Sequence, residues 1–183
     1  MTAMVVFESM FGGTQAIAEA VAAGIASCGL HVDVVEVGRV VGDGERAPWH
    51  VTDVLLLAVG GPTHLRGMST NGSRTQARAL GPTISGLTGL DRWLGSAPDL
   101  VSGTPVAAFD TAWGTADSGS AARAIAERLQ DLSGRLVAPP ASFKVTGTAT
   151  GPTDAELERA FDWGTTLVSA RSTSTARAAG SAG

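Results

Sequence analysis

A short loop of hydroxyl residues and glycines near the N-terminus is the part of the sequence best suited to bind an anion. The loop reads Ser9-Met10-Phe11-Gly12-Gly13-Thr14, and it separates an apolar run at residues 4–7 from a helical pattern at residues 14–27. The first backbone N–H groups of a helix lack partners within the helix, and the helix dipole favours negative charge there. The loop contains no lysine or arginine, so it lacks the side chain that triphosphate chemistry requires. The sequence therefore predicts a pocket for the phosphate of a tightly bound cofactor.

Alternating strand-like and helix-like segments must position this loop. Apolar runs predict strands at residues 4–8, 31–37, 53–60, 105–109 and 141–146. Apolar residues at helical spacing predict helices at residues 14–27 and 118–132, shorter helices between residues 71 and 97, and a last helix after a capping box at Thr153. This alternation predicts an α/β fold, a three-layer α/β/α doubly wound sandwich whose five-stranded parallel sheet has the order 2-1-3-4-5. In that order the loops after the first, third and fourth strands meet where the strand order reverses.

The glycine loop also has a purely structural interpretation. Gly12 and Gly13 would make a tight turn, and Ser9 or Thr14 would cap the helix that follows. The two interpretations are compatible, because a cap and a phosphate satisfy the same N–H groups. We favour phosphate binding because the loop falls at the expected switch point of the sheet.

Length and composition indicate one folded domain. The chain has 183 residues, of which 44% are hydrophobic, and this is enough for a proper core. We expect the domain to span residues 1–170. Residues 171–183 are mainly Ser, Thr, Ala and Gly, so we expect them to form a disordered C-terminal tail.

Charge and cysteine content exclude several classes of protein. The formal net charge is −4 and no basic stripe is present, so we expect no nucleic-acid partner. No run of 18 apolar residues and no signal-peptide pattern occurs, so we expect no membrane insertion and a cytoplasmic location. The single Cys28 excludes an intramolecular disulfide and a cysteine-only metal site, and we expect no structural metal. Four arginines, at positions 66, 74, 78 and 92, are interpreted as solvated surface in preference to a docking patch.

Two segments, in the expected order, resemble the flavodoxin family. The Ser9–Thr14 loop is similar to the flavodoxin phosphate loop, Ser/Thr-x-x-Gly-x-Thr after the first strand. The segment Gly60-Gly61-Pro62-Thr63-His64 resembles the Gly-x-Pro-Thr segment beside the flavin ring. The resemblance covers residues 3–170, and it implies a flavodoxin-like FMN-binding domain with noncovalently bound FMN and one-electron transfer.

The resemblance also implies which residues hold FMN. Ser9, Gly12, Gly13 and Thr14 would hold the phosphate, with the amides of Met10 and Phe11 alongside. The loops after the third and fourth strands would flank the ring, and they contribute Pro62, Thr63, His64, Leu65, Arg66 and Gly67, then Asp110, Thr111, Ala112 and Trp113. We assign no catalytic residue and no metal ligand.

Several ring-side positions keep two interpretations. His64 stands where the family often has a large aromatic residue, so it stacks on the ring or acts as a base, and we favour stacking. Gly67 either frees the neighbouring backbone to bond the flavin N5 or only makes a turn. Trp113 either stacks on the flavin or is a partly buried core residue or a partner-facing residue. Asp110 is either an acid near the flavin or a turn residue.

The resemblance implies a low-potential electron carrier between a reductase and an acceptor, with both as redox partner proteins. Two alternatives remain open. One is an FMN-dependent NAD(P)H:quinone or flavin reductase, and the other is a flavin-free flavodoxin-like interaction domain. The visible spectrum of the purified protein separates the last alternative from the others.

Overall fold

The fold was described from a computed structural model that places residues 2–41, 54–64, 67–86, 88–113, 119–147 and 150–180. Strands and helices alternate along the chain, as the apolar periodicities predict. The elements are β1 (Thr2–Phe7), α1 (Gly13–Ser27), β2 (Val32–Glu36), α2 (Val37–Val41), β3 (Val54–Pro62), α3 (Asn71–Leu80), α4 (Leu90–Ser96), α5 (Pro98–Val101), β4 (Pro105–Ala112), α6 (Ala121–Asp131), β5 (Arg135–Leu136), β6 (Ala141–Lys144) and α7 (Asp154–Gly180).

The strands form one parallel sheet in the order β2-β1-β3-β4-β5, which confirms the predicted doubly wound fold. The fifth position is shared by two short strands. β5 pairs with the start of β4 and β6 pairs with its end. Pro139 and Pro140 lie between them, and because proline has no N–H group it interrupts the hydrogen-bond ladder.

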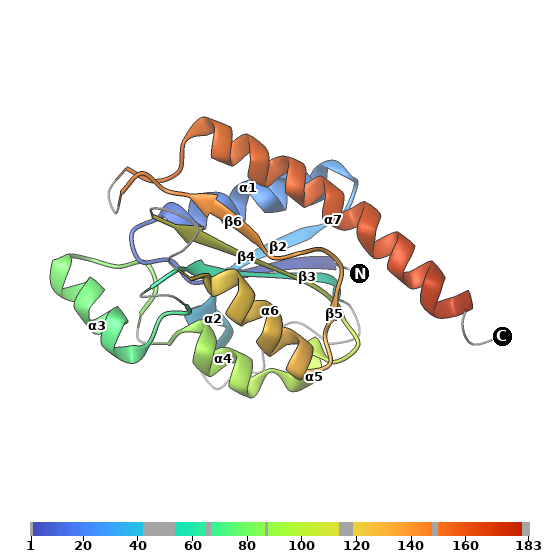
Figure 1. The fold of residues 1–183 in the computed structure, drawn as a ribbon, viewed down its shortest axis with the longest axis horizontal. Coiled ribbons are helices and arrows are strands. Elements are labelled where there is room, and N and C mark those ends of the chain that lie inside the picture. Colours follow the sequence, from blue (N-terminus) through green and yellow to red (C-terminus); the bar gives the residue numbers. More distant parts are fainter. Residues whose placement is uncertain are drawn as a thin grey trace.

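Two apolar cores lie on opposite faces of the sheet, because side chains alternate along each strand. In β1, Val5 and Phe7 face α1 and α7, whereas Met4 and Val6 face the side of α4 and α6. Figure 1 shows α1 and α7 above the sheet and α4, α5 and α6 below it. Burial on both faces explains why β3 contains the continuous run from Leu55 to Val59.

Helices α1 and α7 pack with their backbones in close approach. A Cβ atom added to Gly24 would lie 2.0 Å from the carbonyl oxygen of Phe161, and one added to Gly164 would lie 2.3 Å from that of Val21. Any larger residue at these positions would force the helices apart. This contact fixes α1, and therefore the loop that precedes it.

Helix α7 continues past residue 170, where we expected the folded domain to end, and runs to Gly180. Residues 171–179 contain neither proline nor glycine, and their alanines and arginines favour helix. In Figure 1 this end of α7 extends beyond the sheet. Residues 181–183 lie outside the described part of the chain. Within that part, no helix has the length and apolar character needed to cross a bilayer.

Candidate functional site

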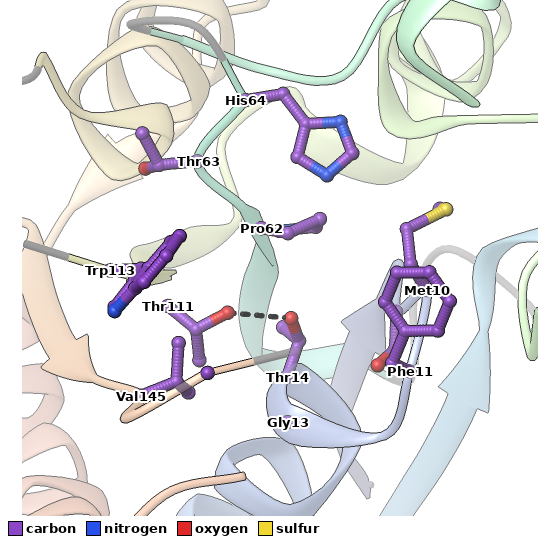
Figure 2. Close-up of a pocket in the computed structure, with 12 residues that line it drawn as sticks. Met10, Phe11, Gly13, Thr14, Pro62, Thr63, His64, Thr111, Trp113 and Val145 are labelled. Carbon is purple, nitrogen blue, oxygen red and sulfur yellow. Dashed lines mark hydrogen bonds between the residues drawn. The ribbon is translucent and has the colours of Figure 1, made fainter. Parts of the chain in front are cut away.

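A cavity of about 180 Å³ opens at the carboxyl ends of β1, β3 and β4, where the sequence predicts the site. Figure 2 shows its walls, with the β3 segment on one side and the start of α1 on the other. Most of the residues implied by the family resemblance meet here. The lining consists of Ser9, Met10, Phe11, Gly13, Thr14, Pro62, Thr63, His64, Thr111, Trp113, Val145 and Gly147.

The glycine loop forms a cradle of hydrogen-bond donors at the N-terminus of α1. Gly12 precedes the helix with a φ of 95°, a left-handed conformation that favours glycine. The Ser9 hydroxyl oxygen accepts hydrogen bonds from the N–H groups of Gly12 and Gln15, at 3.2 and 3.3 Å. These bonds occupy both lone pairs of the Ser9 oxygen, so its hydrogen is left to be donated.

Further donors in the loop lack a protein acceptor. Among the described residues, the N–H groups of Phe11, Gly13 and Thr14 make no hydrogen bond. They lie with the Ser9 hydroxyl where the helix dipole favours negative charge. The residues present therefore fit a phosphate group. Ser9 acts as the predicted cap, because it binds two N–H groups while its own hydrogen stays available.

The segment after α3 is hydrogen-bonded to the backbone of this loop. The Ser9 N–H group donates to the Ser85 hydroxyl at 2.9 Å, and the Ser85 N–H group donates to the Ser9 carbonyl at 2.8 Å. The Ile84 N–H group donates to the Met10 carbonyl at 2.9 Å. These bonds hold the loop backbone in place without using the donors that face the cavity. The sequence carries no signal for this contact, because it joins residues 76 positions apart.

The far wall of the cavity comes from the ends of β4 and β6. The Thr14 and Thr111 hydroxyls lie 2.7 Å apart, and this bond joins α1 to β4 (Figure 2). The Val145 N–H group donates to the Ala112 carbonyl at 3.0 Å, so Ala112 supports the wall without lining the cavity. Val145 and Gly147 were not predicted as site residues. The position of the fifth strand beside β4 is the signal that could have identified them.

Asp110 is buried in β4, and its hydrogen bonds hold the segments that surround the cavity. Its Oδ2 atom accepts hydrogen bonds from the Thr63 hydroxyl at 2.9 Å, the Ser120 hydroxyl at 2.7 Å and the Ala122 N–H group at 2.9 Å. Asp110 does not line the cavity, and it lies in a strand, so it is not a turn residue. It ties the β3 loop to the start of α6.

His64 occupies the corner of the cavity next to α3. Its backbone exchanges two hydrogen bonds with Gly67, at 2.9 and 3.0 Å, so Gly67 closes a tight turn. The His64 Nδ1 atom lies 3.0 Å from the Ser73 hydroxyl. Burial lowers the pKa of His64, and the positive charge of Arg74 lowers it further. Leu65 and Arg66, which were also predicted as site residues, lie outside the described residues.

Trp113 lies at the opposite rim and is largely open to solvent. Its exposed fraction is 73%, which excludes a core position. Figure 2 shows its ring across the cavity from the Phe11 ring. The rim of the cavity is therefore aromatic on two sides, which suits a flat aromatic ligand.

A buried group of charges lies directly beside the glycine loop. Glu8 and Arg74 are each 1% exposed. Glu8 accepts hydrogen bonds from the Ser69 hydroxyl and, at 3.0 Å, from the Leu90 N–H group that begins α4. An Arg74 nitrogen lies 3.8 Å from Glu8 and 3.0 Å from Asp91. Burial raises the pKa of Glu8, against the opposing effects of its hydrogen bonds and of Arg74.

This arrangement corrects one interpretation of the sequence. Arg74 was expected to be solvated, and that expectation is wrong. Gly89 is what makes room for it, because a Cβ atom there would lie 1.9 Å from the Arg74 guanidinium. Arg74 belongs to α3 and Leu90 begins α4, and both contact Glu8, which follows β1. Glu8 therefore fixes α3 and α4 to the strand end that precedes the glycine loop.

The predicted site residues thus fall into three groups. Ser9, Met10, Phe11, Gly13, Thr14, Pro62, Thr63, His64, Thr111 and Trp113 line the cavity. Gly12, Gly67, Asp110 and Ala112 shape the loops around it. Leu65 and Arg66 are not described.

Comparison with known proteins agrees with this geometry. The sequence profile of the flavodoxin family matches residues 5–164. A flavodoxin from the domain Archaea has a similar fold, with a TM-score of 0.64 and 22% identity over 94% of this chain and 99% of that chain. A comparison with curated protein sequences found no match.

Two other solved structures show how widely the fold is used. The flavodiiron protein from Giardia intestinalis has a TM-score of 0.64 and 21% identity over 94% of this chain, which spans 36% of that protein. A WrbA-like flavodoxin from Agrobacterium tumefaciens has a TM-score of 0.62 and 15% identity over 94% of this chain and 98% of that chain. At these identities the likeness concerns the fold. The family profile covers most of the sequence, and the chain belongs to the flavodoxin family.

Proposed function

We propose that the chain binds FMN in this cavity and acts as a low-potential electron carrier between a reductase and an acceptor protein. The observation that carries the proposal is the donor cradle at the start of α1. There the Ser9 hydroxyl hydrogen and the N–H groups of Phe11, Gly13 and Thr14 lack acceptors among the described residues. A phosphate group would satisfy all of them at once.

The protein residues have distinct tasks in this proposal. FMN, when bound, accepts and returns electrons one at a time. The glycine loop holds the phosphate without a cationic side chain, and the bonds of Ser85 and Ile84 keep the loop in its bound shape before the cofactor arrives. Such preorganisation raises affinity, because the ordering cost has already been met in folding.

The other end of the cavity would take the ring. Phe11 and Trp113 offer flat surfaces there, and Pro62 forms the floor between them (Figure 2). The exposure of Trp113 leaves this end open to the surface. An open ring edge suits electron transfer to another protein, because transfer requires close approach and no covalent contact.

The visible spectrum of the purified protein tests cofactor binding. We expect flavin absorption bands that remain with the protein through gel filtration, and release of FMN on denaturation at one FMN per chain. A colourless protein that fails to take up added FMN would contradict the proposal and would support the flavin-free alternative.

Steady-state kinetics separate a carrier from a reductase. We expect the FMN-loaded protein to oxidise NADPH with a quinone acceptor only when a separate flavoprotein reductase is added. Rapid oxidation without that reductase would instead establish the NAD(P)H-dependent enzyme that we kept as the alternative. The comparison uses one protein sample and one acceptor, so only the added reductase differs.

A further inference from the structure

The side chain of His64 is held by a serine that also begins a helix. Thr70 precedes α3, and its hydroxyl accepts a hydrogen bond from the Ser73 N–H group at 3.2 Å. In return the Ser73 hydroxyl accepts a bond from the Thr70 N–H group at 2.9 Å. The same Ser73 oxygen lies 3.1 Å from the Thr70 carbonyl oxygen and 3.0 Å from the His64 Nδ1 atom.

A count of hydrogens decides the direction of these bonds. The Ser73 hydroxyl has one hydrogen and two lone pairs, and one lone pair already accepts from the Thr70 N–H group. If the hydroxyl donated to His64, two oxygen lone pairs would face each other across the 3.1 Å contact with the Thr70 carbonyl. If it donates to the Thr70 carbonyl, the His64 Nδ1 atom must donate to it, and all three contacts become hydrogen bonds.

The other ring nitrogen faces the cavity. Figure 2 shows one nitrogen of His64 directed toward α3 and the other directed into the space between Pro62 and Met10. The second nitrogen, Nε2, has no hydrogen-bond partner within the described segments. Burial and the Arg74 charge lower the pKa of His64, so the ring is neutral at pH 7 and carries a single hydrogen.

We propose that Ser73 fixes His64 in its Nδ1–H tautomer, so that Nε2 presents a lone pair to the cavity and selects ligand forms that carry an N–H hydrogen there. His64 is then a ligand-contacting residue and Ser73 a positioning residue. A flavin ring gains an N–H group when it is reduced. The part of the inference that concerns FMN rests on the proposed function, whereas the tautomer belongs to the protein alone.

Nitrogen NMR of the FMN-free protein tests the tautomer directly. The chain has three histidines, and the spectrum of His64→Leu identifies the signals of His64 by their loss. With ¹⁵N-labelled histidine at pH 7, we expect the chemical shift of His64 Nδ1 to be that of a protonated nitrogen. The shift of Nε2 should be that of an unprotonated nitrogen. An unprotonated Nδ1 and a protonated Nε2 in the unmodified protein would overturn the proposal.

Three variants distinguish the effect of the Ser73 hydroxyl on His64 from its effect on the start of α3. Ser73→Ala removes the acceptor at Nδ1, so the Nε2–H form should appear, and Ser73→Thr should restore the original signals. Thr70→Ala weakens the start of α3 through the reciprocal bond but leaves the Ser73 hydroxyl, so the tautomer should not change. Equal effects of Ser73→Ala and Thr70→Ala, or no effect of Ser73→Ala, would contradict the role of Ser73.

Binding measurements then test what Nε2 selects. His64→Leu should weaken binding of reduced FMN by about 2- to 10-fold more than binding of oxidised FMN, the range expected for one hydrogen bond. An equal loss for both forms would contradict the selection. If neither form binds the unmodified protein, the proposed function fails, while the NMR result still decides the tautomer.

Discussion

The hydroxyl groups of Thr14 and Thr111 lie 2.7 Å apart and join the first turn of α1 to the end of β4. The two residues are 97 positions apart in the sequence, and both line the cavity. The bond sets the width of the phosphate end of the site. It also orients the Thr14 hydroxyl, which stands beside the donors of the glycine loop.

Replacing Thr111 with valine should weaken FMN binding while leaving the fold intact. Valine keeps the branched shape but removes the hydroxyl, so Thr14 loses its partner. One hydrogen bond contributes about 1 kcal/mol, which corresponds to a roughly fivefold higher dissociation constant. Fluorescence titration of FMN measures this change. The control is Thr166→Val on the exposed side of α7, which should leave the affinity unchanged, and an equal effect of both variants would count against the contact.

Removing the charge of Arg74 should destabilise the protein strongly. Arg74→Met leaves Glu8 buried without a cation, and breaking a buried ion pair in this way costs about 3–5 kcal/mol. Arg78→Met is the matched control, because Arg78 is exposed on the same helix and its loss should cost less than about 0.5 kcal/mol. Denaturant unfolding of both variants measures the difference. A small and similar cost for both would show that the buried network contributes little.

The stability of the protein should fall with rising pH on account of Glu8. Burial raises the pKa of Glu8 in the folded state above its ordinary value of 4.5, so the folded protein binds this proton more tightly than the unfolded chain. The resulting contribution is fully present below pH 4.5 and is lost as the pH rises through the folded pKa. Glu8→Gln cannot titrate, so its free energy of unfolding should lack this fall. Unfolding of both proteins between pH 4 and 7 tests the sign, and a difference that stays constant over this range would refute it.

Two glycine-to-alanine variants should have opposite effects on stability. Gly24→Ala places a Cβ atom 2.0 Å from the Phe161 carbonyl, so overpacking between α1 and α7 should cost about 1–3 kcal/mol. Gly95→Ala adds a Cβ atom to an exposed helical position with nothing within 4 Å, and it should gain about 0.5–1 kcal/mol. Thermal unfolding of the pair reports both signs. A gain in stability for Gly24→Ala would mean that the two helices do not meet as described.

The strands and the position of the glycine loop could be predicted because their signals are local. The apolar run from Leu55 to Val59 predicts a buried strand, and that strand is present. The loop from Ser9 to Thr14 is predicted to lie in the site, and it lines the cavity before α1. The strand order then followed from chain topology, since few right-handed arrangements exist for five parallel strands.

The parts that could not be predicted depend on contacts between distant segments. A lone arginine is usually solvated, and the burial of Arg74 requires Glu8 and Asp91 together with the space beside Gly89. Ser85 is likewise an ordinary loop residue in the sequence, and its role appears only when its segment lies against Ser9.

The most direct test of the central claim compares FMN with riboflavin, which has the same ring but no phosphate. If the start of α1 holds the phosphate, FMN should bind at least about 100-fold more tightly than riboflavin, because several N–H and O–H donors would otherwise stay unpaired. Ser9→Ala should reduce that ratio, since it removes the donated hydrogen and the anchor of the Gly12 and Gln15 N–H groups. Equal affinity for the two flavins in the unmodified protein would contradict the assignment of the glycine loop as a phosphate site.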